Sequence, residues 1–249
     1  MSLPYQLFSC FCIGIFSGFM SGMFGIGGGS IRIPLLNFVG LPLLAAYGIN
    51  LFVIPFSSMV GAFNHRDNID YKISLYMIIG GTFGSVIGAL FVGVIPSLVL
   101  AIIFVVVTFM TLFVMHMNKF LPEIAKKINP TPLNIFLGTL FLNMITGMRG
   151  GSGGSLFPPF LKVMKLDIHK AIATSLFVTI FTSISALVIY WHRGDITWMP
   201  ALSVLLGSMI GSHLGSKMSL KTKPKWLEIG LSVLVLILAL LVVYKSIIS

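Results

Sequence analysis

Long apolar runs alternate with short polar loops along almost the whole chain. The longer runs approach the about 20 residues that a helix needs to cross a bilayer core. They predict helices at 4–24, 41–63, 73–92, 97–117, 132–148, 171–191, 199–216 and 226–244, with shorter helical pieces at 30–38 and 155–161. The chain is 57% hydrophobic and 9% charged. The pattern therefore predicts an all-α polytopic membrane protein, a multi-pass protein of the plasma membrane surrounded by lipid.

Two glycine-rich segments interrupt this pattern, and each is a copy of the other. The first runs from Gly22 to Leu36 and the second from Gly147 to Leu161, and more than half of the aligned positions are identical. Adjacent glycines destabilise a helix, so each copy predicts a break between a long helix and a short one. Because unwound backbone is costly in lipid, it persists only where it is buried in protein or lines a cavity.

The repeat extends beyond the two breaks. The pattern Gly80-x-x-x-Gly84 in the first half returns as Gly207-x-x-x-Gly211 in the second. Small residues at this spacing let helices approach closely, so we expect a packing role for these glycines. The sequence thus divides into a first repeat at 1–118, a linker at 119–131 and a second repeat at 132–249, which together form a single membrane domain.

The distribution of Lys and Arg predicts that the two repeats are inverted. Basic residues favour cytoplasmic loops, so the net charge of +10 reflects membrane orientation and gives no reason to expect nucleic acid as a partner. If each half is a re-entrant hairpin followed by three crossings, most basic residues share one side. They are Arg66, Lys72, Lys119, Lys126, Lys127, Lys162, Lys165, Lys170, Lys217, Lys221, Lys223 and Lys225, whereas the other side receives Arg193 and Lys245. If the two repeats were instead parallel, uncharged loops and lysine-rich loops would lie on the same side of the membrane.

Inverted repeats with broken helices at matching positions indicate a secondary transporter with a site near the bilayer midplane. We expect each short helix to begin at its serine, Ser30 or Ser155, and to turn its positive end toward a small anion. Two arginines accompany the breaks, and an intramembrane arginine indicates function. The predicted substrate-binding residues are Gly27, Gly28, Gly29, Ser30, Arg32, Asn50, Arg149, Ser152, Gly153, Gly154, Ser155 and Ser175.

Other kinds of chemistry find little support in the sequence. All six acidic residues lie in loops or next to span ends, so no proton relay through buried carboxylates is predicted. The sequence contains no metal-ligand spacing, no P-loop and no nucleophile arrangement. We therefore expect a protein that is not an enzyme and has no cofactor. Two alternatives stay open: a passive anion channel, and a membrane thiol oxidoreductase using Cys10 and Cys12. The sequence does not settle a coupling ion (H⁺ or Na⁺), the direction of transport or the oligomeric state.

The paired motif also points to a family. It reads Gly25-Ile-Gly-Gly-Gly-Ser with Pro34 in the first half and Gly150-Gly-Ser-Gly-Gly-Ser with Pro159 in the second, and the run Ala173-Thr-Ser-Leu-Phe follows. These residues resemble the sulfite exporter TauE/SafE family of membrane permeases over nearly the whole chain. The resemblance implies a carrier of small sulfur-containing or organic anions, such as sulfite, thiosulfate, sulfoacetate and other sulfonates. We therefore expect a permease for sulfite, an organosulfonate or another sulfur oxyanion, working by alternating access.

Overall fold

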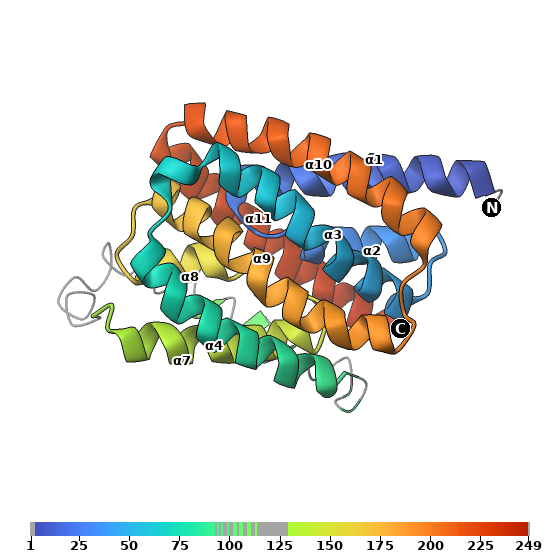
Figure 1. Ribbon diagram of the computed structural model, residues 1–249, viewed down its shortest axis with the longest axis horizontal. Coiled ribbons are helices and arrows are strands. Elements are labelled where there is room, and N and C mark those ends of the chain that lie inside the picture. The colour runs from blue at the N-terminus through green and yellow to red at the C-terminus, as the bar shows by residue number, and fades with distance from the viewer. Residues whose placement is uncertain are drawn as a thin grey trace.

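The computed structural model describes residues 3–92 and 129–248 continuously, with scattered positions between 94 and 113. Every secondary-structure element in these residues is helical, which confirms the all-α prediction (Figure 1). The span predicted at 97–117 and most of the predicted linker fall largely outside them. The first half contains α1 (Leu3–Phe24), α2 (Gly29–Phe38), α3 (Leu43–Asn64), the 3-10 turn η1 (Arg66–Asn68) and α4 (Tyr71–Leu90). The second half contains α7 (Pro132–Gly147), α8 (Phe157–Val163), α9 (Ile168–His192), α10 (Trp198–Lys221) and α11 (Pro224–Ile248).

Four of the described helices, α1, α3, α4 and α9, are long and apolar enough to cross a membrane. Helix α7 is apolar but has only 16 residues. Helices α10 and α11 have 24 and 25 residues. The outer surface carries large apolar side chains such as Phe83, Leu206 and Leu214, each more than half exposed. Such a surface would be unfavourable in water and suits contact with lipid.

Two of the acidic residues have a local structural task. The Asp70 carboxylate accepts a hydrogen bond from the backbone N–H of Ile73 at 3.0 Å and caps the start of α4. The Asp167 carboxylate caps α9 in the same way, accepting from the N–H of Lys170 at 3.1 Å. In both loops, the last side chain therefore accepts a hydrogen bond from a backbone N–H group in the first turn of the following helix, which has no partner within that helix.

The first helix of each half packs along the third long helix of the other half. Helix α1 lies beside α10, and α7 lies beside α4 (Figure 1). A Cβ atom on Gly211 would clash with a backbone carbonyl of α1, and one on Gly18 would clash with α10. A Cβ atom on Gly84 would likewise clash with a backbone carbonyl of α7. The packing role predicted for the duplicated small-residue pattern is confirmed.

Helices α3 and α9 lie between these two outer pairs (Figure 1). Each accepts a hydrogen bond from the third long helix of the other half. Ser212 Oγ on α10 donates to the Ser57 carbonyl at 2.6 Å, and Ser85 Oγ on α4 donates to the Thr182 carbonyl at 2.8 Å. These donors and acceptors occupy matching places in the two repeats, so the halves make equivalent contacts with one another.

The ends of the helix bundle differ in the loops that they carry. Both chain termini and the α9–α10 loop lie toward the right of Figure 1, whereas the α3–α4, α8–α9 and α10–α11 connections lie at the left. The three connections at the left include Arg66, Lys165 and Lys223. Each of these three connections thus carries a basic residue, whereas the α9–α10 loop at the other end carries Arg193.

Candidate functional site

The two glycine-rich breaks lie against each other in the protein interior. A Cβ atom at Gly154 would be only 2.6 Å from the carbonyl oxygen of Ile26, and one at Gly27 would be 3.6 Å from the Cα atom of Gly154. All three residues are buried. Because glycine has no side chain, the two backbones approach each other directly. Segments 125 residues apart in the sequence (27 and 152, for example) thus share one location.

The backbones of the two breaks also have matching conformations. Gly25 and Gly150 have φ angles of 72° and 66°, and Gly28 and Gly153 have φ angles of 74° and 72°. This left-handed region strongly favours glycine. The repeat in the sequence is therefore a repeat in backbone geometry, and at these positions glycine is required by conformation.

The predicted helix starts at Ser30 and Ser155 are wrong. Helix α2 begins one residue before Ser30 and is capped by the left-handed Gly28, with no side-chain bond. Helix α8 begins two residues after Ser155, because Pro158 and Pro159 suit the first turn of a helix and delay its start. Proline has no N–H, so the second helix start offers an anion fewer donors than the sequence pattern suggested.

Asn50 and Ser175 join the two breaks through a crossed pair of hydrogen bonds. Asn50 Nδ2 on α3 donates to the carbonyl of Gly150 at 2.7 Å, and Ser175 Oγ on α9 donates to the carbonyl of Gly25 at 2.6 Å. All four residues are buried. Each carbonyl lies in an unwound segment and has no helical partner, so each half supplies the donor that the break of the other half needs.

Arg32 lies at the centre of this arrangement with a fully buried side chain. Its guanidinium group donates to three uncharged side chains. Nε bonds to Ser17 Oγ at 3.2 Å, and the two terminal nitrogens bond to Asn50 Oδ1 at 2.8 Å and to Ser208 Oγ at 3.1 Å. Among the described residues no carboxylate forms an ion pair with it. A buried charge of this kind is costly unless something compensates it.

Some of the remaining predicted residues lie close to Arg32 and Asn50, and others lie farther away. The amide group of Asn50 lies so close to Gly29 that a Cβ there would be 2.6 Å from Nδ2. Ser152 is 3% exposed, and its Oγ has no hydrogen-bond partner within the described part of the chain. Arg149 is half-buried beside the second break, where it interacts electrostatically with Tyr47. The structure thus brings Arg32, Asn50 and both breaks together and gives Arg149 different neighbours.

Sequence reasoning missed Ser17 and Ser208, which hold the Arg32 side chain. Both are fully buried, and Ser208 also donates to the Gly14 carbonyl at 3.1 Å. One signal was available, since each serine stands next to a glycine of the small-residue faces, Gly18 and Gly207. A hydroxyl on a closely packed helix face can reach a group in the neighbouring element.

The thiol chemistry considered as an alternative has little basis in this geometry. Cys10 is buried in an apolar cluster, whereas Cys12 is exposed, and both are free thiols. Within the described ranges, no group of three or more His, Cys, Asp or Glu side chains could hold a metal ion. The polar groups that do converge are those of Arg32, Asn50 and the serines around the breaks.

Comparison with known proteins identifies a family and several relatives. The profile of the sulfite exporter TauE/SafE family matches residues 10–242. A probable membrane transporter protein of Methanocaldococcus jannaschii is 29% identical over 187 residues, which are 72% of this chain and 70% of that protein. The probable membrane transporter proteins YdhB and YunE of Bacillus subtilis are 27% and 24% identical and cover 80% and 95% of this chain, with 83% and 97% of their own lengths aligned. No solved structure matches.

These relatives are named as probable membrane transporters, and the family is one of transporters, not of enzymes. The protein is therefore a multi-pass membrane transporter, and the thiol oxidoreductase alternative is set aside. The chain belongs to the sulfite exporter TauE/SafE family.

Proposed function

We propose that this protein is a secondary transporter of a small anion, either sulfite or another sulfur oxyanion such as a short organosulfonate. The anion would bind where the two breaks meet, and the substrate-binding groups would come from Arg32 and from the backbone and hydroxyl groups of both breaks. The family description supports the sulfur chemistry, and the buried guanidinium supports the charge of the ligand. The plasma membrane is the proposed location.

The observation that carries the proposal is the buried charge of Arg32, which no carboxylate in the described part of the chain compensates. A guanidinium group has five N–H donors and fixed geometry suited to an oxyanion. Three of its contacts are to neutral side chains, which hold its position without neutralising it. An anion at about 4 Å would gain about 4 kcal/mol in an environment of effective dielectric constant about 20. That gain would offset part of the cost of burying the charge.

Ser152 and Ser21 add polar groups to the same region. Both hydroxyls are buried and have no partner in the described part of the structure. A Cβ on Gly28 would lie 3.0 Å from an Arg32 terminal nitrogen and 3.4 Å from the Cβ of Ser21, so the first break runs beside both residues. Buried hydroxyls normally find a partner, and an oxyanion would supply one.

We further infer that the two halves are inverted and expose the site alternately to each side of the membrane. The equivalent contacts between halves, the matching φ angles and the basic loops at one end support this topology. Movement of one half against the other would then change which break borders on water, because the two breaks belong to opposite halves.

Transport by purified protein in liposomes tests the proposal. Liposomes loaded with unlabelled sulfite should accumulate external radiolabelled sulfite against its gradient for a short period, because a carrier exchanges internal for external substrate. Sulfoacetate, sulfate and acetate would be offered as competitors to define the anion class. Flux that stays strictly downhill, without exchange, would instead establish the passive channel.

A further inference from the structure

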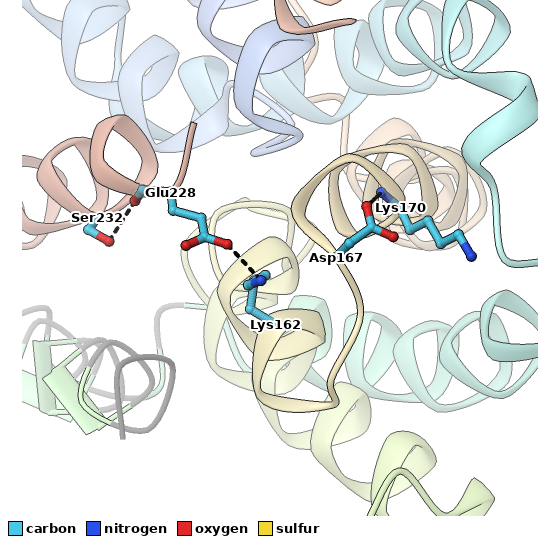
Figure 2. Close-up of polar contacts among 5 residues, drawn as sticks. All are labelled: Lys162, Asp167, Lys170, Glu228 and Ser232. Atoms are coloured by element: carbon cyan, nitrogen blue, oxygen red, sulfur yellow. Dashed lines mark hydrogen bonds and ion pairs between the residues drawn. The ribbon is translucent and has the colours of Figure 1, made fainter. Parts of the chain in front are cut away.

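Helix α11 contacts α1 and α9 through its apolar side and α8 through a charged residue. Leu227 and Leu231 belong to a buried cluster with residues of α9 and with Phe24, the last residue of α1 at the edge of the first break. About one turn from the start of α11, Glu228 Oε1 lies 2.7 Å from Nζ of Lys162, which projects from α8 just after the second break (Figure 2). One helix is therefore connected to both breaks.

The Lys162–Glu228 ion pair differs in kind from the others in the described residues. The other two join residues one or two positions apart within loops, whereas this pair links two separate helices. Its side chains are 21% and 35% exposed, so water screens the pair only in part. Exposed pairs contribute little to stability, but a shielded pair holds its two elements in a defined arrangement.

The position of Glu228 also differs from that of the helix-capping carboxylates Asp70 and Asp167. It lies in α11 among apolar residues, while Asp70 and Asp167 cap helices from loops. A carboxylate in an apolar helix is costly without a partner. Figure 2 shows that Lys162 reaches toward Glu228, whereas the side chain of nearby Lys170 extends away from the pair.

We propose that the Lys162–Glu228 ion pair is a positioning contact that couples the second break to α11 and, through α11, to the first break. The pair opens and re-forms as the breaks change their exposure during transport. This inference rests on the proposed alternating exposure of the breaks, but it concerns neither the identity of the anion nor its contacts. Its test therefore measures exposure of a break directly.

The test uses a reporter cysteine at a break, Ser152→Cys, in full-length protein with Cys10→Ala and Cys12→Ala. The labelling rate by a membrane-impermeant maleimide is measured in liposomes without substrate. Lys162→Glu and Glu228→Lys should each change this rate about fivefold, as expected when one partly shielded ion pair is lost. The double charge exchange should restore the rate to within about twofold. Lys170→Glu is the matched control and should leave the rate unchanged.

Rescue by the charge exchange separates coupling from simple damage to the fold. If a single variant unfolds, the neutral variants Lys162→Gln and Glu228→Gln replace it, and they should shift the rate in the same direction. Unchanged labelling in all variants, or single effects that the exchange does not restore, would overturn the proposal. The two proposals can also fail separately. If the double charge exchange restores the labelling rate but Arg32→Gln still binds sulfite normally, the proposed anion site is wrong and the coupling through the Lys162–Glu228 pair is retained.

Discussion

Replacing Asn50 by alanine should destabilise the protein far more than replacing its repeat counterpart Ser175. Asn50 accepts from the charged Arg32 at 2.8 Å and donates to the Gly150 carbonyl at 2.7 Å. Ser175 makes one neutral bond, to the Gly25 carbonyl at 2.6 Å. The two variants therefore remove different numbers and kinds of bonds from equivalent positions in the repeat.

The difference can be estimated from these contacts. Neutral hydrogen bonds between membrane helices average about 0.6 kcal/mol and reach about 1.7 kcal/mol, so Ser175→Ala should cost about 1 kcal/mol. A bond to a charged group is worth about 1.5–3 kcal/mol, and its loss leaves one terminal nitrogen of the buried guanidinium without its acceptor. Asn50→Ala should therefore lower the free energy of unfolding by about 3 kcal/mol, the sum of one charged and one neutral bond.

Reversible unfolding of the purified protein in mixed micelles, followed by circular dichroism during titration with dodecyl sulfate, measures both values. Asn64→Ala is the control on the same helix, because Asn64 is only partly buried and its Nδ2 contacts only neutral groups, Ser216 Oγ at 2.7 Å and His213 Nδ1 at 3.2 Å. Its cost should resemble that of Ser175→Ala. If Asn50→Ala costs no more than either of these variants, Asn50 does not support the buried charge.

Three further outcomes follow from the structure. His65 is fully buried beyond the end of α3, and its ring nitrogens have no hydrogen-bond partner in the described residues; burial and nearby His169 lower its pKa from 6.5 to about 4. Between pH 6.5 and pH 4 the unfolded state therefore binds more protons than the folded state. The free energy of unfolding should fall by up to about 3 kcal/mol from pH 7 to pH 4. Unfolding of the His65→Leu variant should not show this loss. Gly153→Ala places a Cβ at φ 72° and 2.6 Å from the Phe157 ring, so thermal melts should show a lower midpoint than for the exposed Gly194→Ala, which has open space at φ 75°. Gly211→Val should disrupt α1–α10 packing and abolish the folded peak in size-exclusion chromatography, whereas normal elution would contradict the close contact.

The sequence was informative where a feature repeats. The Gly25 and Gly150 breaks, and the small-residue faces around Gly84 and Gly211, could be predicted because each copy supports the other. Asn50 and Ser175 were also among the predicted site residues. Their contacts to the carbonyls of the opposite breaks could not be predicted, because those distances depend on how two distant segments fold together.

Other features escaped sequence reasoning for local reasons. Ser30 and Ser155 matched the usual preference for serine at a helix start, but glycine conformation at the first break and paired prolines at the second determined the starts. Ser17 and Ser208 were missed because a serine on a packed helix face looks the same whether it bonds its own helix or a neighbour. Arg149 stands directly beside its glycines in the sequence, yet only Arg32 is fully buried.

Equilibrium binding of sulfite to the purified transporter tests the central claim most directly. Isothermal titration would compare the unaltered protein with Arg32→Gln and with Lys221→Ala, which removes a positive charge at the exposed end of α10. Loss of about 4 kcal/mol of attraction at Arg32 should weaken binding about a thousandfold, while Lys221→Ala should stay within about twofold of the unaltered protein, because exposed charges are screened by solvent and salt. Equal affinity for Arg32→Gln and the unaltered protein would contradict an anion site at the junction of the two breaks.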